Sequence, residues 1–178
     1  WSNELPKFTD AKTYTVQYKV SKANYNDVTG SYQFTINKAD MTYIVKAVTG
    51  AAYTGEAQAS ATVDIPDGAS ISYVWAGGNS VDVVPSFTDA GTYEMEYTIT
   101  KDNYNSVTDT YTFTIANAAA SELNVVANNI NTVYDGTAKA VSVTALAGAT
   151  IEYSVNGGQS WSTTAPSFTD VVETTVAY

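Results

Sequence analysis

The chain has 178 residues and a formal net charge of −10, with eight lysines and no arginine, histidine or cysteine. This balance argues against nucleic acid or an anionic membrane surface as partner, because both are bound through clustered basic side chains. Without cysteine or histidine, the chain cannot form disulfides, thiolate metal sites, or Ser-His-Asp and Cys-His catalytic groups. No apolar run approaches the roughly 18 residues that cross a bilayer, so we expect no membrane insertion of this segment.

The chain repeats itself. Pro-Lys-Phe-Thr-Asp-Ala-Lys-Thr-Tyr begins at Pro6, and Pro-Ser-Phe-Thr-Asp-Ala-Gly-Thr-Tyr begins at Pro85. A looser copy, Pro-Ser-Phe-Thr-Asp-Val-Val-Glu-Thr, begins at Pro166. Spacings of 79 and 81 residues predict an array of small modules. We expect the C-terminal half of a repeat in residues 1–37 (the first module), a complete repeat in residues 38–117 (the middle module), and a repeat lacking its last strand in residues 118–178 (the third module).

Large apolar side chains alternate with threonine and other polar residues in every module, which is the pattern of strands that bury one face. We therefore expect most of the fourteen tyrosines to point into cores, together with Trp75. Gly, Asn and Asp clusters separate the strands every 8–12 residues and predict turns. The sequence predicts an all-β chain of tandem antiparallel Greek-key β-sandwiches. The predicted inward stripes are Tyr14–Val20, Ile71–Trp75, Tyr93–Ile99, Tyr111–Ile115 and Ile151–Val155.

The connectors between modules are short, with four residues between Ile36 and Met41 and five between Ile115 and Ser121. Connectors this short favour neighbouring modules that touch, and hence a rod. The incomplete first and third modules leave two interpretations open. The chain is a window on a longer polypeptide, which the start at Trp1 also favours, or the tail of one copy is completed by the head of the next. The second interpretation is strand addition across an open edge, which would build a filament.

The segment Asp-Ala-Gly-Thr-Tyr-Glu-Met from Asp89 to Met95 resembles the Asp-x-Gly-x-Tyr-x-Cys signature of immunoglobulin-like domains, with Met95 at the cysteine position. The resemblance implies a tyrosine corner, in which the tyrosine hydroxyl bonds to backbone near the preceding turn. Asp89 and Tyr93 would form it in the middle module, and Asp10 and Tyr14 in the first. The third module keeps Asp170 but has Thr174 at the tyrosine position, which puts its corner in doubt.

Taken together, the modules supply a wider set of motifs in a fixed order: Tyr-Asp-Gly and Gly-Gly-x-Ser-Trp, as written in the third module, then Pro-x-Phe-Thr-Asp-Ala-Gly-Thr-Tyr and Asn-Tyr-Asn followed by Thr-Phe-Thr-Ile, as written in the middle module. This order resembles bacterial immunoglobulin-like repeats of the Tyr-Asp-Gly type, which occur in tandem in surface and secreted proteins. The resemblance implies an extracellular or cell-surface location and a structural or adhesive role, as a stalk or fibre. The alternative is a module that binds a carbohydrate or a host protein. Neighbouring repeats, and other copies of the chain, are the expected partners.

Candidate ligand-binding residues are Trp1 and Trp161, whose flat rings can stack on a sugar when exposed. The sequence alignment places Val81 at their position in the middle module. The competing interpretation is that they pack at a sheet edge or a module boundary.

Catalysis and metal binding are not expected. The available acids lie in turns or on threonine-rich faces, where no apolar pocket is evident to adapt them for hydrolysis. Calcium remains an option at the repeated Asp10, Asp89 and Asp170 and at the Asp64–Asp67 turn, although Asp before a strand more often caps its own turn. Lys22 and Lys101, beside Asn24 and Asn103, are expected in a solvated loop rather than in a buried isopeptide crosslink. We therefore expect no enzyme and no cofactor.

Overall fold

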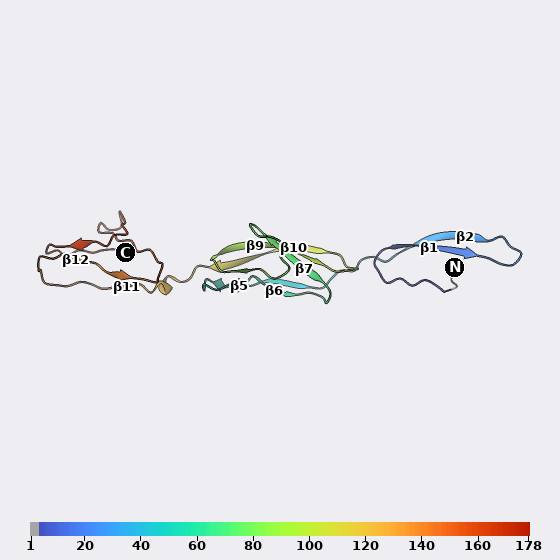
Figure 1. Cartoon of the computed structure of the whole chain (residues 1–178), viewed down its shortest axis with the longest axis horizontal. Helices are drawn as coiled ribbons and strands as arrows, with labels where there is room; N and C mark the ends of the chain where they lie inside the picture. The colour runs from blue at the N-terminus through green and yellow to red at the C-terminus, as the bar shows by residue number, and fades with distance from the viewer. Residues whose placement is uncertain (1–3) are drawn as a thin grey trace. The chain divides into compact units, whose positions relative to one another are not determined.

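The computed structural model describes residues 4–178 and divides into two compact units, with the boundary between Asn117 and Ala118 (Figure 1). Within the described residues every regular element is a β-strand except one short 3₁₀ turn, η1 (Ala120–Leu123). The chain is therefore all-β, and its strands form several separate sheets.

The middle module is built on a four-stranded sheet in the order β4-β10-β9-β7. Its strands are β4 (Ala51–Ala52), β7 (Ser70–Trp75), β9 (Gly91–Thr100) and β10 (Val107–Ala116). The β10–β9 and β9–β7 pairs are antiparallel, but β4 pairs parallel to β10, with Ile115 opposite Ala51. The expectation of a purely antiparallel module is wrong at this pair. The reason is that the chain leaves a neighbouring sheet at the Gly50 turn and continues alongside β10.

The remaining strands of this module form two small pairs. One pair joins β3 (Ile44–Ala47) to β6 (Ala61–Asp64), and the other joins β5 (Gln58–Ala59) to β8 (Ser86–Phe87). Val45 of β3 and Val63 of β6 pack against the buried cluster that includes Tyr97 and Ile99 of β9. The β3–β6 pair therefore covers one face of the four-stranded sheet, and Figure 1 shows β5 and β6 on the opposite side of the module from β9 and β10.

The predicted inward stripes of the middle module form its core. One cluster holds Tyr73, Tyr97 and Ile99, each at most 4% exposed, together with Met41. A second cluster holds Met95, Phe113 and Ile115, each at most 1% exposed, and the half-buried Trp75 packs against it. The outward face carries threonines that bond across strands, such as Thr98 to Thr108 at 3.0 Å between hydroxyl oxygens.

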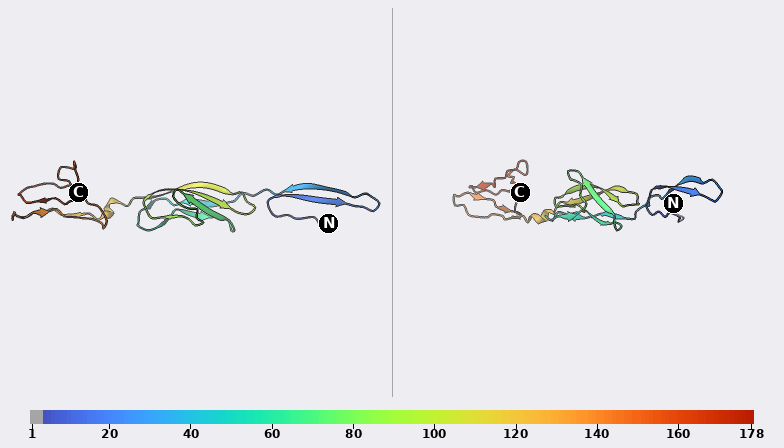
Figure 2. Two further views of the ribbon diagram at one scale, coloured as in Figure 1. Left: turned by 45° about the horizontal axis from the view of Figure 1, so that its top comes forward. Right: turned by 45° about the vertical axis from the view of Figure 1, so that its right-hand side comes forward.

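In the first module, β1 (Thr13–Val20) and β2 (Val28–Thr35) form a long antiparallel hairpin (Figure 2). The sequence prediction of a buried stripe is wrong for most of this hairpin, because Tyr18 is 44% exposed and Val20 61%. On β2, Tyr32 and Phe34 are likewise exposed. The reason is that the first module contains no second sheet among the described residues to cover this face.

The third module has only four two-residue strands: β11 (Val126–Ala127), β12 (Lys139–Ala140), β13 (Val143–Thr144) and β14 (Ser167–Phe168). The strand predicted over Ile151–Val155 is absent there, and only isolated bridges at Tyr153 and Ser154 remain. The matching segment of the middle module, β7, pairs along its length with β9, and β9 is paired on its other side with β10. In the third module the counterpart of β9 meets Ile151–Val155 only at the Ser154–Ala177 bridge, which matches the Val74–Glu96 pair. Residues 118–178 include no counterpart of β10, so the ladder that would hold this edge is incomplete.

Candidate binding surfaces

The two tyrosines proposed for a corner have the same local geometry. The Tyr14 hydroxyl donates to the Asp10 carbonyl oxygen at 2.9 Å, and the Tyr93 hydroxyl donates to the Asp89 carbonyl oxygen at 2.8 Å. Each hydroxyl therefore fastens the turn that precedes its own strand. Such a bond contributes about 1 kcal/mol to stability and supplies no chemistry.

An aromatic stack accompanies each of these bonds, and the sequence analysis missed it. Phe87 stacks on Tyr93 with ring centroids 3.9 Å apart, and Phe8 stacks on Tyr14 at 4.0 Å. Phe8 and Phe87 lie at the Phe of the repeated Pro-x-Phe-Thr-Asp motif, six residues before the tyrosine. The repetition of that phenylalanine was the available signal for the contact.

Trp161 is a half-exposed side chain, 49% accessible, on a well-bonded turn of the third module. The Gly158 amide donates to the Ser154 hydroxyl at 2.9 Å, and the Asn156 side-chain amide donates to the Ser160 hydroxyl at 2.8 Å. A shallow pocket of about 130 Å³ adjoins the indole, with Tyr153 among its lining residues. This is a surface on which a flat apolar ring could stack. Trp1 lies outside the described residues.

The register corrects the alignment of Trp161. Tyr153 forms its bridge with Ser162, and the equivalent Tyr73 forms its bridge with Val81. Ser162 therefore corresponds to Val81, and Trp161 corresponds to Ser80. Val81 does not replace a tryptophan. It is one of the partly buried apolar residues that pack against the core cluster containing Tyr73.

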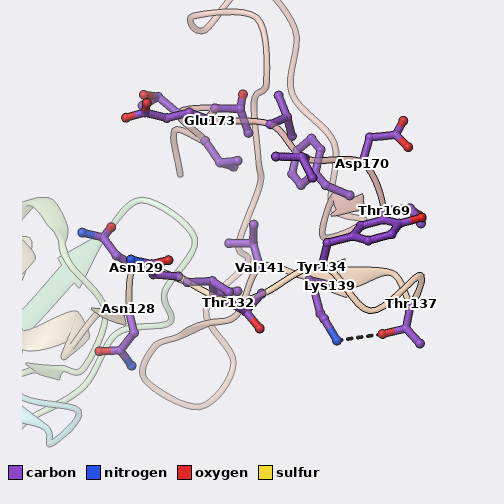
Figure 3. Close-up of a pocket in the computed structure, with 18 of the residues that line it drawn as sticks. Asn128, Asn129, Thr132, Tyr134, Thr137, Lys139, Val141, Thr169, Asp170 and Glu173 are labelled. Carbon is purple, nitrogen blue, oxygen red and sulfur yellow. Dashed lines mark hydrogen bonds between the residues drawn. The ribbon is translucent and has the colours of Figure 1, made fainter.

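The third module contains a wide hollow of about 790 Å³, lined by residues from the 127–143 and 168–178 segments (Figure 3). On one wall, the Lys139 ammonium donates to Asp135 at 2.6 Å and to the Thr137 hydroxyl at 2.7 Å. These bonds, the one from Lys139 first, lower the pKa of Asp135 to about 2. Figure 3 shows the carboxylates of Asp170 and Glu173 apart and pointing in different directions.

The acids considered for hydrolysis lie at the surface. All six are exposed, and no group of three or more acidic side chains that could hold a metal ion occurs in residues 4–178. The calcium candidates Asp10 and Asp170 are exposed as well. The six acids are Asp64, Asp67, Asp82, Asp89, Glu94 and Glu96.

The described part of the chain has no helix long and apolar enough to cross a membrane.

The Lys-x-Asn-Tyr-Asn loops lie on the surface. The Lys22 ammonium lies 5.0 Å from the centroid of the Tyr25 ring, and the Lys101 ammonium 4.9 Å from that of Tyr104. Lys22 is exposed and Lys101 half-buried. Each lysine is therefore packed on a tyrosine ring at the surface and not enclosed with a carboxylate.

The fold and sites of the middle module can be compared with known families. Residues 44–119 match the family model of the MBG domain. The MBG match begins at the first residue of β3 and ends just after β10, so it spans nearly the whole middle module. MBG domains are repeat-like domains of bacterial surface proteins. No curated protein and no solved structure gives a significant match to the chain.

Proposed function

We propose that this chain is a non-catalytic structural segment of a bacterial cell-surface or extracellular protein. In this proposal its modules are tandem immunoglobulin-like β-sandwiches of the Tyr-Asp-Gly type, arranged as a rod. The observation that carries the proposal is the MBG match over residues 44–119, which coincides with the module that has its own dry core. The role is mechanical: the modules hold an adhesive part, or one another, at a distance from the cell.

The topology of the middle module supports a load-bearing role. β4 lies near the start of the module and β10 at its end, and the two strands pair in parallel. The Tyr53 amide adds a bond to the Ala116 carbonyl oxygen at 2.8 Å. Because parallel neighbours at opposite chain ends are pulled in opposite directions, tension loads their bonds together instead of opening them one at a time.

Small-angle X-ray scattering of the 178-residue chain tests the rod, and surface proteolysis of cells that make the parent protein tests the location. We expect a maximum dimension close to the summed lengths of the modules, and cleavage of the segment on intact cells. A compact particle would contradict the rod, and protection from protease until the cells are lysed would contradict the location. We also expect no turnover in hydrolase assays, glycosidase substrates included.

Head-to-tail completion is part of this proposal as a route to filaments. The surfaces that would meet are the exposed Tyr18, Tyr32 and Phe34 of the first hairpin and the incompletely paired edge of the third module, where Ile151–Val155 and the C-terminal segment share only the Ser154–Ala177 bridge. Sedimentation equilibrium from micromolar to millimolar concentration tests this route. Growing oligomers would support it, and a monomer across the whole range would leave the longer-polypeptide interpretation.

A second candidate function is carbohydrate binding at Trp161. The half-exposed indole ring of this residue favours such binding. Stacking of a sugar ring depends on the flat face of the aromatic side chain. Trp161→Ala should therefore abolish glycan binding, and Trp161→Phe should retain part of it. A glycan array followed by calorimetry gives the readout. Equal binding by the wild type and Trp161→Ala would remove this candidate.

A further inference from the structure

The loop between β9 and β10 contacts two segments that lie far earlier in the chain. The side-chain oxygen of Asn103 accepts a hydrogen bond of 2.6 Å from the Ala11 amide, in the turn that precedes β1. The side-chain amide of Asn105 donates to the Asp40 carboxylate at 2.7 Å, in the connector between the first and middle modules. The six-residue loop between β9 and β10 therefore contacts both the turn before β1 and the connector, residues 37–40, that joins the first module to the middle one.

Backbone bonds strengthen this contact. The Ala39 amide donates to the Asn103 carbonyl oxygen at 3.0 Å, and the Asn105 amide donates to the Ala39 carbonyl oxygen at 2.8 Å. Ala39 and Tyr104 form a parallel bridge. The connector is thus paired like an added strand, and Asn103 accepts through its main chain and its side chain at once.

The sequence explains why this loop can do so. Asn103 has φ 66°, a left-handed conformation that asparagine tolerates better than most residues. Lys101 and Tyr104 enclose the turn that contains Asn103: the Tyr104 amide donates to the Lys101 carbonyl oxygen at 3.2 Å, and the Lys101 ammonium lies over the Tyr104 ring. The first hairpin carries the same motif, with Asn24 at φ 70° and Lys22 over Tyr25. Among residues 4–178 no hydrogen bond reaches the side chains of Asn24 and Asn26, so the motif adopts its shape without a partner.

We propose that the Lys-x-Asn-Tyr-Asn loop is a docking site through which each repeat holds the end of the repeat before it. Its partner is an extended connector that offers backbone N–H and C=O groups and an acidic side chain, together with the Asp-Ala turn beside it. Residues Lys22–Asn26 form the same site for the end of another repeat of this kind. The proposal rests on the proposed function, because it assumes tandem repeats, but it assumes nothing about where the parent protein is located.

Hydrogen exchange on the full chain tests the side-chain bond with a matched pair, Asn103→Gly and Asn24→Gly. Glycine accepts the left-handed φ at both positions, so each variant removes only an amide side chain. We expect Asn103→Gly to speed exchange of the Ala11 amide by about tenfold and to leave the Ala39 amide nearly unchanged, because Ala39 bonds to main chain. Asn24→Gly should change neither. Equal Ala11 exchange in both variants would overturn the proposal.

A distance measurement tests whether the site holds the joint. The chain has no cysteine, so spin labels at Thr29→Cys and Thr110→Cys, both exposed positions, report on it cleanly. The distance distribution should broaden in the double variant Asn103→Gly/Asn105→Ala and stay narrow in Asn24→Gly/Asn26→Ala. An equally narrow distribution in both would overturn the docking role. A cytosolic location of the parent protein would refute the proposed function and leave these results standing.

Discussion

The hairpins β1–β2 and β9–β10 share their sequence pattern and strand register but lie in different surroundings. Tyr14 pairs with Phe34 in the first, and the residues 79 positions later, Tyr93 and Phe113, pair in the second. Even a threonine pair on the outer face recurs, Thr13 with Thr35 and Thr92 with Thr114. Yet Phe34 is 45% exposed and Phe113 is fully buried.

The difference separates what a strand's own sequence decides from what its neighbours decide. Pairing and register follow from alternation and turn residues, which both hairpins share. Burial requires a second layer: in the middle module Ala51, Trp75 and Phe87 pack against the cluster that holds Phe113, and the β3–β6 pair packs against the cluster that holds Tyr97. The same apolar stripe is therefore a core in one module and an exposed face in the other.

The largest expected effect comes from truncating the two equivalent phenylalanines. Phe113→Ala should destabilise the middle module by about 3–5 kcal/mol, because it leaves a cavity among Met95, Ile115 and their neighbours. Phe34→Ala should cost less than about 1 kcal/mol, because its side chain already contacts water. Urea unfolding followed by residue-resolved NMR measures both, and similar costs would contradict the comparison.

The next effect concerns the hydroxyls of the half-buried Tyr111 and the buried Tyr73, which differ in hydrogen bonding. The Tyr111 hydroxyl lies 2.8 Å from the Ser60 hydroxyl, and Ser60 is fully buried. The buried Tyr73 hydroxyl has no hydrogen-bond partner among the described residues. Tyr111→Phe should therefore cost about 1–2 kcal/mol, whereas Tyr73→Phe should be neutral or stabilising. Chemical denaturation of the two variants decides, and a loss for Tyr73→Phe would indicate a bound water or another partner.

Alkaline pH should unfold the middle module. Burial, as the main cause, raises the pKa of Tyr73 and of Tyr97 to about 12. The folded state thus favours the neutral form of both tyrosines. Their contribution to the free energy of unfolding is complete below about pH 10 and is lost as the pH rises from about 10 to 12. Circular dichroism and tyrosinate absorbance should change together in this range. Ionisation of all the tyrosines with β structure intact would contradict the burial.

The smallest effect is at Asp135, in the third module. Its pKa of about 2 lies below the ordinary value, mainly because Lys139 donates to it. The small stabilisation it gives is present above the ordinary carboxyl pKa and fades as the pH falls toward 2. The free energy of unfolding of the third module should therefore depend slightly less on pH in the acid range in Asp135→Asn than in the wild type. Added salt should weaken the stabilisation that Asp135 gives the wild type. An NMR pH titration of the Asp135 carboxyl checks the value.

Much of the fold follows from alternation. The stripe from Tyr93 to Ile99 is strand β9, and Tyr111 to Ile115 lie in β10, because their parity and turns are local properties of the sequence. The parallel β4–β10 pair was not predictable, since it depends on where the chain changes sheet. The exposure of Tyr18 and the missing strand at Ile151–Val155 depend on partners that no local pattern reveals.

The candidate sites were predictable to a smaller degree. The hydroxyl bond of Tyr93 could be expected because it reaches only four residues back along the chain. The contact of Asn103 with Ala11 spans 92 residues, and nothing in the local sequence marks Ala11 as its partner. The bond between Ser60, which lies between β5 and β6, and Tyr111 of β10 spans 51 residues, and the local sequence does not mark this partner either.

The central claim is that the middle module is a self-contained repeat whose second sheet, and not its hairpin sequence, creates its stability. Amide hydrogen exchange on the intact chain tests it most directly, by comparing register-matched amides such as Phe113 and Phe34. We predict that β9–β10 amides exchange at least about a hundredfold more slowly than their counterparts in β1–β2, because a buried ladder opens only with its module. Equal protection of the two hairpins would contradict the claim.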